Sequence, residues 1–103
     1  MPHYVSLYKF TEQGAKNMQE SPKRMERIKE MFKSAGAEVK SMYAVLGEYD
    51  SVMIAEAPND ETMAKLNLMV ASEGNVHCET LRAFNEQEFK QLLMGMAELK
   101  KAA

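Results

Sequence analysis

A four-residue turn between two apolar segments constrains this chain more than any other feature. Residues 39–46 and 52–57 are rich in side chains that favour strands, and the turn Gly47-Glu48-Tyr49-Asp50 lies between them. Segments joined so closely pair as an antiparallel hairpin, because a parallel pair needs a crossover of about a dozen or more residues. The second segment is apolar on both faces, which is typical of a strand buried on both sides of its sheet.

Two amphipathic helices are predicted on either side of this hairpin. Apolar residues recur at helical spacing over residues 22–35, after Ser21 as a cap, and Gly36 ends the pattern. The second helix is predicted between Asn59, another favoured N-cap, and Gly74, with acidic residues in its first turn.

Two further strands, at residues 3–10 and 76–84, complete the order β-α-β-β-α-β. This order is the ferredoxin-like motif, an α+β sandwich, and residues 1–103 are predicted to form one such domain. Right-handed crossovers place both helices on one face of the sheet and leave the other face bare.

The first strand indicates that a second subunit covers the bare face. Tyr4, Tyr8 and Phe10 fall on one side of this strand, whereas Val5 and Leu7 fall on the other. A bare face that carries aromatic side chains would be an unusually large exposed apolar patch for a monomer. We therefore expect the chain to form a homodimer or a multiple of it.

A third helix is predicted at the C-terminal end of the chain. Asn85 and Glu88 have the spacing of a capping box, with Asn as the cap. Apolar residues follow at helical spacing, and we expect Phe89 and Leu92 to be buried, so that truncating either would destabilise the fold.

Charge and composition exclude several classes of protein. Thirteen basic and fifteen acidic residues give a net charge of -2, and the bases alternate with acids over residues 23–30, so a nucleic-acid role is not expected. The longest apolar stretch, residues 42–46, is far shorter than the roughly 20 residues of a membrane span, and the first residues lack a signal-peptide pattern. Cys78 is the single cysteine, which cannot form an internal disulfide, and we expect a cytoplasmic protein without membrane contact.

Three segments carry recurrent sequence signatures. They are the turn at 47–50 with Val52-Met53-Ile54-Ala55-Glu56-Ala57-Pro58, the stretch 74–84 from Gly74-Asn75-Val76 to Ala83-Phe84, and residues 4–14 with Ser21-Pro22. In order and spacing they resemble the GYD-domain family, and the likeness reaches to about residue 93. The resemblance implies a bacterial or archaeal protein that forms a dimeric α/β barrel, in a family largely without assigned activity.

The segment Glu48-Tyr49-Asp50 is the first candidate ligand site. At the mouth of a barrel, this hairpin tip would hold a phenol and two carboxylates over a ligand. The alternative is a structural turn, in which Gly47 adopts unusual backbone angles and Asp50 bonds the backbone, and the general turn preferences of Gly and Asp favour it.

Three further residues are candidates for the same site. His77 and Glu79 share one face of their strand and could act as a general base and its partner, or form an exposed pair on an edge strand. Glu56 is in register with apolar neighbours, where a carboxylate is costly unless it is paired, although it also lies near the end of its strand. With only two histidines and without a glycine-rich phosphate loop, no metal and no cofactor are expected.

Three classes of function fit these features. The first is a self-associating domain that binds a small organic molecule between the bare sheet face and its cover. The second is a cofactor-free enzyme of the dimeric α/β-barrel type, similar to a monooxygenase or an isomerase, and only fold analogy supports it. The third is a structural or regulatory oligomer without a ligand.

Overall fold

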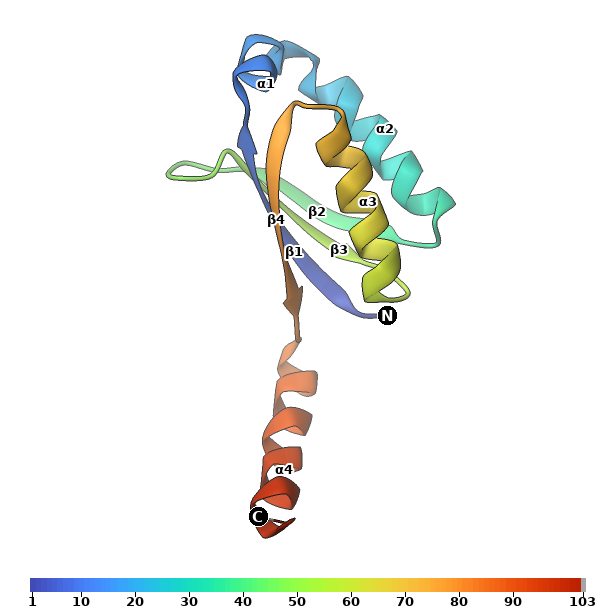
Figure 1. Cartoon of the computed structure of the whole chain (residues 1–103), viewed down its shortest axis with the longest axis vertical. Coiled ribbons are helices and arrows are strands. Elements are labelled where there is room, and N and C mark those ends of the chain that lie inside the picture. The colour runs from blue at the N-terminus through green and yellow to red at the C-terminus, as the bar shows by residue number, and fades with distance from the viewer. Residues whose placement is uncertain (103) are drawn as a thin grey trace.

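Four antiparallel strands form one sheet in the computed structural model, which describes residues 1–102 (Figure 1). The strands are β1 (His3–Phe10), β2 (Glu38–Ala44), β3 (Ser51–Glu56) and β4 (Val76–Ala83). Their order across the sheet is β2-β3-β1-β4, so β1 and β3 are central and β2 and β4 form the edges. This arrangement confirms the predicted α+β, ferredoxin-like fold.

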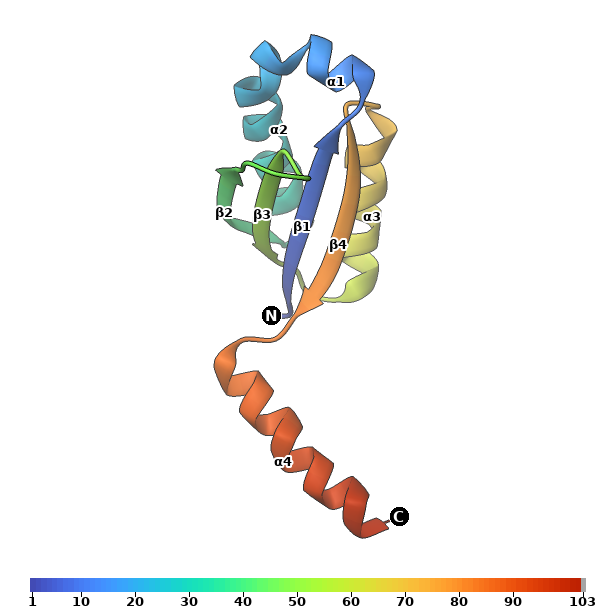
Figure 2. The same ribbon diagram turned by 90° about the vertical axis from the view of Figure 1, so that its left-hand side faces the viewer.

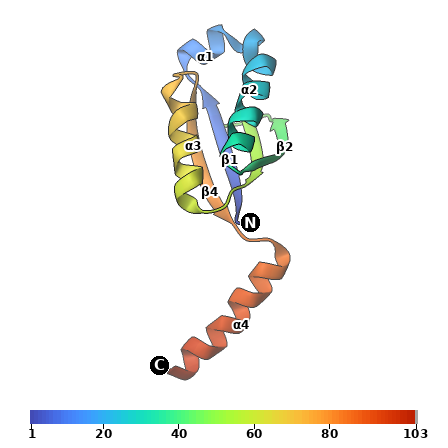
Figure 3. The same cartoon turned by 90° about the vertical axis from the view of Figure 1, so that its right-hand side faces the viewer.

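Both crossover helices lie on the same face of the sheet, as Figure 2 and Figure 3 show. The helical elements are α1 (Glu12–Lys16), a 3-10 turn η1 (Met18–Glu20), α2 (Ser21–Ser34), α3 (Asp60–Ser72) and α4 (Glu86–Ala102). Since α2 and α3 cover one face, the other face of the sheet has no helix over it within the described residues 1–102.

The helix ends match the sequence signals with one exception. The Asn59 side chain accepts a hydrogen bond from the backbone N–H of Thr62 at 2.8 Å, which caps α3. Gly36 and Gly74 have φ of 78° and 80°, the left-handed region in which glycine ends a helix without a steric penalty. The prediction that Ser21 is a cap is wrong, because η1 leads directly into α2 and Ser21 already has helical backbone angles.

The side of β1 that carries Tyr4, Ser6 and Tyr8 faces the helices. The side chains of these three residues are buried, with exposed fractions of 3%, 0% and 4%. The prediction that the aromatic side of this strand is the bare one is therefore wrong. Val5 and Leu7 point to the uncovered face instead, since side chains alternate along a strand.

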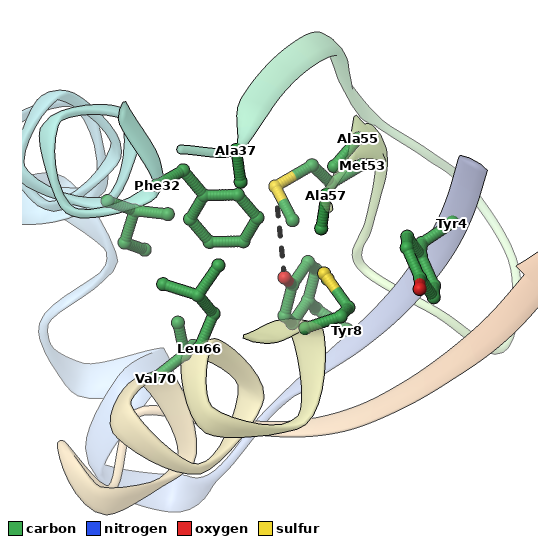
Figure 4. Packing of buried hydrophobic residues seen from close by; sticks show 11 residues of the cluster. Tyr4, Tyr8, Phe32, Ala37, Met53, Ala55, Ala57, Leu66 and Val70 are labelled. Atoms are coloured by element: carbon green, nitrogen blue, oxygen red, sulfur yellow. Dashed lines mark hydrogen bonds between the residues drawn. The ribbon is translucent and has the colours of Figure 1, made fainter. Parts of the chain in front are cut away.

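The hydrophobic core fills the space between the sheet and the two crossover helices (Figure 4). Phe32 of α2, Leu66 of α3 and Met53 of β3 are its centre, and all are at most 2% exposed. The Tyr8 hydroxyl donates to the thioether sulfur of Met53 at 3.9 Å, drawn as a dashed line in Figure 4. Core packing thus depends on adaptable sulfur side chains as well as on aliphatic and aromatic ones.

The C-terminal helix α4 extends away from the rest of the chain (Figure 1). Its start is capped as predicted: the Asn85 side chain accepts from the Glu88 N–H at 2.8 Å, and the Glu88 carboxylate accepts from the Asn85 N–H at 2.9 Å. Phe89 and Leu92, however, are 55% and 47% exposed. The expectation that they are buried is wrong for the single chain, because α4 lies beyond the end of β4 and away from the rest of the domain.

Candidate functional site

The uncovered side of the sheet has an apolar centre, and we call this side the open sheet face. Val5 of β1 lies opposite Ile54 of β3 and Leu81 of β4, and Leu7 lies opposite Val52. Four of these side chains are half-buried by their own neighbours, while Leu81 is 45% exposed. An apolar patch of this kind on a small domain is typical of an interaction surface.

One end of the open sheet face is covered by the loop between β2 and β3. The Tyr49 hydroxyl donates to the Glu79 carboxylate of β4 at 2.7 Å. Lys9 Nζ lies 3.9 Å from the Glu48 carboxylate, and His77 is the strand partner of Lys9. The hydrogen bond to Glu79 raises the pKa of Tyr49, away from the neutral range in which a phenol would be useful for acid–base chemistry.

Asp50 fastens this loop to the end of β1. Its carboxylate accepts from the Phe10 N–H at 2.8 Å, and its own N–H donates to the Tyr8 carbonyl at 2.8 Å. Its carbonyl accepts from the Val45 N–H at 3.0 Å, which closes the loop. Gly47, with φ of 107°, supplies the left-handed residue of the turn. Asp50 and Gly47 thus have the structural role that general turn preferences favoured.

The opposite end of the open sheet face carries a second set of charges around Glu56. His3 Nε2 lies 3.1 Å from Glu56 Oε1, and Lys40 Nζ lies 3.6 Å from Glu56 Oε2. His3 Nδ1 is also 3.4 Å from Glu88 Oε1 at the start of α4. The Asn85 N–H and the nearby His3 hold the pKa of Glu88 below its ordinary value.

Sequence reasoning missed His3, Lys40 and Glu88 as members of this set. His3 is the direct strand partner of Glu56, but that register follows from the strand order and is not visible in one sequence. Lys40 lies where the register of β2 shifts, which turns its side chain toward Glu56. The pairing of Glu56 explains how a carboxylate is tolerated beside apolar neighbours.

The six predicted site residues therefore do not form one cluster. Tyr49 and Glu79 are in contact, and Glu48 and His77 lie at the same end of the open sheet face. Glu56 is at the far end, since its partner on β1 is His3, whereas Tyr8 and Lys9 mark the loop end. A ligand site made from all six residues stays a prediction, and one small molecule would have to span the sheet to reach them.

A cavity of about 350 Å³ lies on the other side of the sheet, between the start of α2 and the ends of β1, β2 and β3. Of the six predicted residues, Asp50 lines it. A second cavity of about 210 Å³ between α3 and β4 is lined by Tyr4, Asp60 and Arg82, among others. The Tyr4 hydroxyl donates to Asp60 there at 2.5 Å, and burial together with this bond raises the pKa of Tyr4 to about 12.

The described part of the chain contains neither a cluster of metal ligands nor a helix that could cross a membrane. Within residues 1–102, no group of three or more His, Cys, Asp or Glu side chains is arranged to hold a metal ion. Among the helices of the same residues, none combines the length and the apolar character that crossing a membrane requires. Cys78 is a free thiol, half-buried, whose sulfur lies 3.7 Å from the Asn67 side-chain oxygen.

Comparison with known proteins gives matches over most of the chain. The model of the GYD domain family matches residues 4–93. A Thermus thermophilus protein named glutamine synthetase and cystathionine beta-lyase binding protein is 37% identical over 84 residues, which are 81% of this chain and 88% of that protein. The crystal structure of TTHA0845 from Thermus thermophilus superposes with a TM-score of 0.54 at 22% identity, covering 82% of this chain and 95% of that one, a likeness of fold.

Proposed function

This chain belongs to the GYD domain family, and from that premise we propose that it is a homodimeric binding protein rather than a catalyst. Two copies pack their open sheet faces together, and residues 1–103 of each act as one domain within the pair. The observation that carries this proposal is the apolar centre of the open sheet face, which no helix of residues 1–102 covers.

A second copy of the chain is the occupant that best fits this face. The centre is aliphatic, while both ends carry charges of both signs: Lys9 with Glu48 at one end, and Lys40 with Glu56 at the other. In a two-fold dimer each patch meets a copy of itself, so a mixed-charge rim can pair without net repulsion. A standard interface buries about 800 Å² per partner, roughly a ninth of the 7169 Å² surface of this chain.

The C-terminal helix gives independent support for self-association. The exposed apolar residues of α4 include Phe89, Leu92, Met96 and Leu99. A helix with one apolar stripe is stable in water when that stripe is packed against another surface. Because α4 points away from its own domain, we propose that it packs on the second copy of the chain.

The enzyme partner in this proposal comes from the related Thermus protein, whose name describes binding to glutamine synthetase and to cystathionine beta-lyase. We propose that the dimer has a similar role, as a cytoplasmic subunit that binds an enzyme. The raised pKa of Tyr49 and the structural role of Asp50 favour binding over acid–base catalysis at the loop end.

Light scattering coupled to size-exclusion chromatography tests the dimer. We expect the wild-type chain at micromolar concentration to show at least twice the 11.7 kDa chain mass. Ile54→Glu places a charge at the centre of the open sheet face and should give a folded monomer. Leu68→Glu is the matched control, because Leu68 is 70% exposed on α3, on the helix side of the sheet, and this variant should keep the wild-type mass.

A monomeric wild-type chain, or an Ile54→Glu variant that stays dimeric, would overturn the assignment of the interface. Biolayer interferometry tests the partner: it measures binding of the dimer to purified glutamine synthetase and to purified cystathionine beta-lyase, both taken from the organism that encodes this chain. Absence of binding to both enzymes would remove the partner from the proposal and leave the dimer as a separate result.

A further inference from the structure

The larger cavity lies under the first half of α2. The buried residues of this helix, Ile28 and Phe32, belong to its middle and second half, whereas Met25 in the first half is half-buried. The helix therefore covers the sheet closely near Phe32 and less closely near its start. The space left there has a volume of about 350 Å³, within the usual range for small-molecule pockets.

The walls of this cavity are mostly apolar and contain several flexible side chains. Methionines 18, 25, 42 and 53 come from η1, α2, β2 and β3 and line it together with aliphatic residues. Methionine side chains adapt to the shape of a bound molecule because they are unbranched and polarisable. The cavity is thus suited to the apolar body of a small molecule.

Arg24 supplies a charged group at this apolar cavity. Its side chain is 13% exposed, and its guanidinium donates through Nη2 to the Asn17 carbonyl and to Ser21 Oγ, both at 3.2 Å. The Glu20 carboxylate lies 3.8 Å from Nη1, but its side chain is 70% exposed. A guanidinium has five N–H donors, so the contacts within the chain leave donors for an acceptor in the cavity.

Asp50 also lines the cavity, and it carries the opposite charge. Its carboxylate already accepts from the Phe10 N–H at 2.8 Å and is fixed by the backbone of the loop. Arg24, by contrast, has its short contacts with neutral acceptors. Its one anionic contact, with Glu20, is longer and lies on a largely exposed side chain, so the half-buried Arg24 still gains from an anion in the cavity, because a charge in apolar surroundings is costly until it is closely paired.

We infer that this cavity binds a small amphiphilic carboxylate, with its hydrocarbon chain among the methionines and its carboxylate on Arg24. The site lies on the helix side of the sheet, opposite the face proposed for self-association. Ligand binding and dimer formation therefore use different surfaces, and this inference goes beyond the proposed function and can fail separately from it.

The test uses octanoate, octylamine and 1-octanol, which share a chain length and differ in charge. Isothermal titration calorimetry on the full chain should show octanoate bound more tightly than octanol, and octylamine bound weakest. Arg24→Gln should weaken octanoate binding by about tenfold or more and leave octanol binding unchanged, because a hydrogen bond to a charged group is lost. Lys23→Gln is the matched control: Lys23 is the adjacent residue, exposed, and its loss changes the net charge equally.

Two further variants separate binding from folding. Arg24→Lys keeps the charge without the planar fork and should retain more octanoate affinity than Arg24→Gln. Met25→Trp adds bulk to the wall of the cavity and should abolish binding of both octanoate and octanol. Melting temperature and dimer mass are measured for every variant, and they should stay close to the wild type for Arg24→Lys and Lys23→Gln.

Three results would overturn the inference. One is wild-type protein that does not bind octanoate at millimolar concentration. Another is equal octanoate affinity in Arg24→Gln and the wild type while both remain folded. The third is tighter binding of octylamine than of octanoate, which would place the head group on Asp50 and refute the anionic ligand.

Discussion

Replacing Phe32 and Phe89 by alanine, one at a time, tests where the stability of this chain resides. Phe32 of α2 is 0% exposed, whereas Phe89 of α4 is 55% exposed. Truncating a fully buried phenylalanine costs about 3–5 kcal/mol, which combines the lost transfer free energy with the cavity left behind. Since domains of this size unfold with about 5–15 kcal/mol, Phe32→Ala should remove a large share of the free energy of unfolding.

Phe89→Ala should cost much less in the isolated chain. Complete burial of such a side chain contributes about 1.5–3 kcal/mol, and more than half of Phe89 is in contact with solvent. We therefore expect a loss of about 1 kcal/mol in dilute solution. In the dimer that we propose, α4 is packed on the second copy, so the cost of Phe89→Ala should rise with protein concentration.

Urea unfolding followed by circular dichroism, at low and at high protein concentration, measures both effects. Unchanged slopes of the unfolding curves would indicate that the variants change stability rather than the unfolded state. A loss of about 3 kcal/mol or more for Phe89→Ala at the lowest concentration would mean that α4 packs on its own domain. That result would refute the arrangement in Figure 1.

Two further predictions concern glycine and tyrosine. A Cβ at Gly14 would lie 1.9 Å from the Asn75 carbonyl oxygen, so Gly14→Ala should lower the free energy of unfolding by about 2 kcal/mol or more. Gly95 has open space around it, so Gly95→Ala should instead increase the helicity of α4, measured by circular dichroism at 222 nm. Equal changes in the free energy of unfolding for the two variants would contradict the close approach at Gly14. Because burial and the Asp60 hydrogen bond raise the pKa of Tyr4 from 10.0 to about 12, the contribution of Tyr4 to stability should be fully present below about pH 10 and should be lost as the pH rises to about 12. Asp60→Asn should reduce this loss in urea midpoints, and an Asp60→Asn variant that keeps the full loss would show that the hydrogen bond does not contribute.

Local sequence signals predicted the elements of this fold well. Asn59 and Asn85 act as helix caps through side-chain bonds to the backbone three residues on, which depends on neighbouring residues alone. Gly36 and Gly74 end their helices for an equally local reason. The resulting order of strands and helices was sufficient to identify the sheet topology, because right-handed crossovers leave few alternatives.

The faces of the sheet were harder to predict than its strands. Because side chains alternate between the two faces of a strand, Tyr4 and Tyr8 were placed correctly on one side of β1. This two-residue alternation alone does not say which of the two sides the helices cover. Ser6 lies between the two tyrosines and is fully buried, and the hydrogen bond of its hydroxyl with that of Thr80 at 2.8 Å, a partner 74 residues away, offsets the cost of burying it. Such long-range partners decide the direction of a strand's faces and are invisible in one sequence.

The candidate sites depended on the same long-range geometry. Tyr49 and Glu79 were both named from the sequence, yet their contact follows from the loop folding over β4. The separation of Glu56 from them, and its pairing with His3, follow from the register of β1 and β3. The cavity beside Arg24 had no sequence signal, since its walls come from helices and strands that are distant from one another in the sequence.

The central position of β1 sets the order in which this chain can fold during synthesis. β1 is the first of the four strands to be made, but its two neighbours in the sheet lie far along the chain: His3 pairs with Glu56 of β3 and with Ala83 of β4. The β2–β3 hairpin is local by comparison, since Ala44 pairs with Ser51. Contacts between distant segments form slowly because the intervening loop must first be closed. We therefore expect α2 and the hairpin to form early on the ribosome, while the sheet closes in a late step, when β4 has emerged and pairs with the free edge of β1.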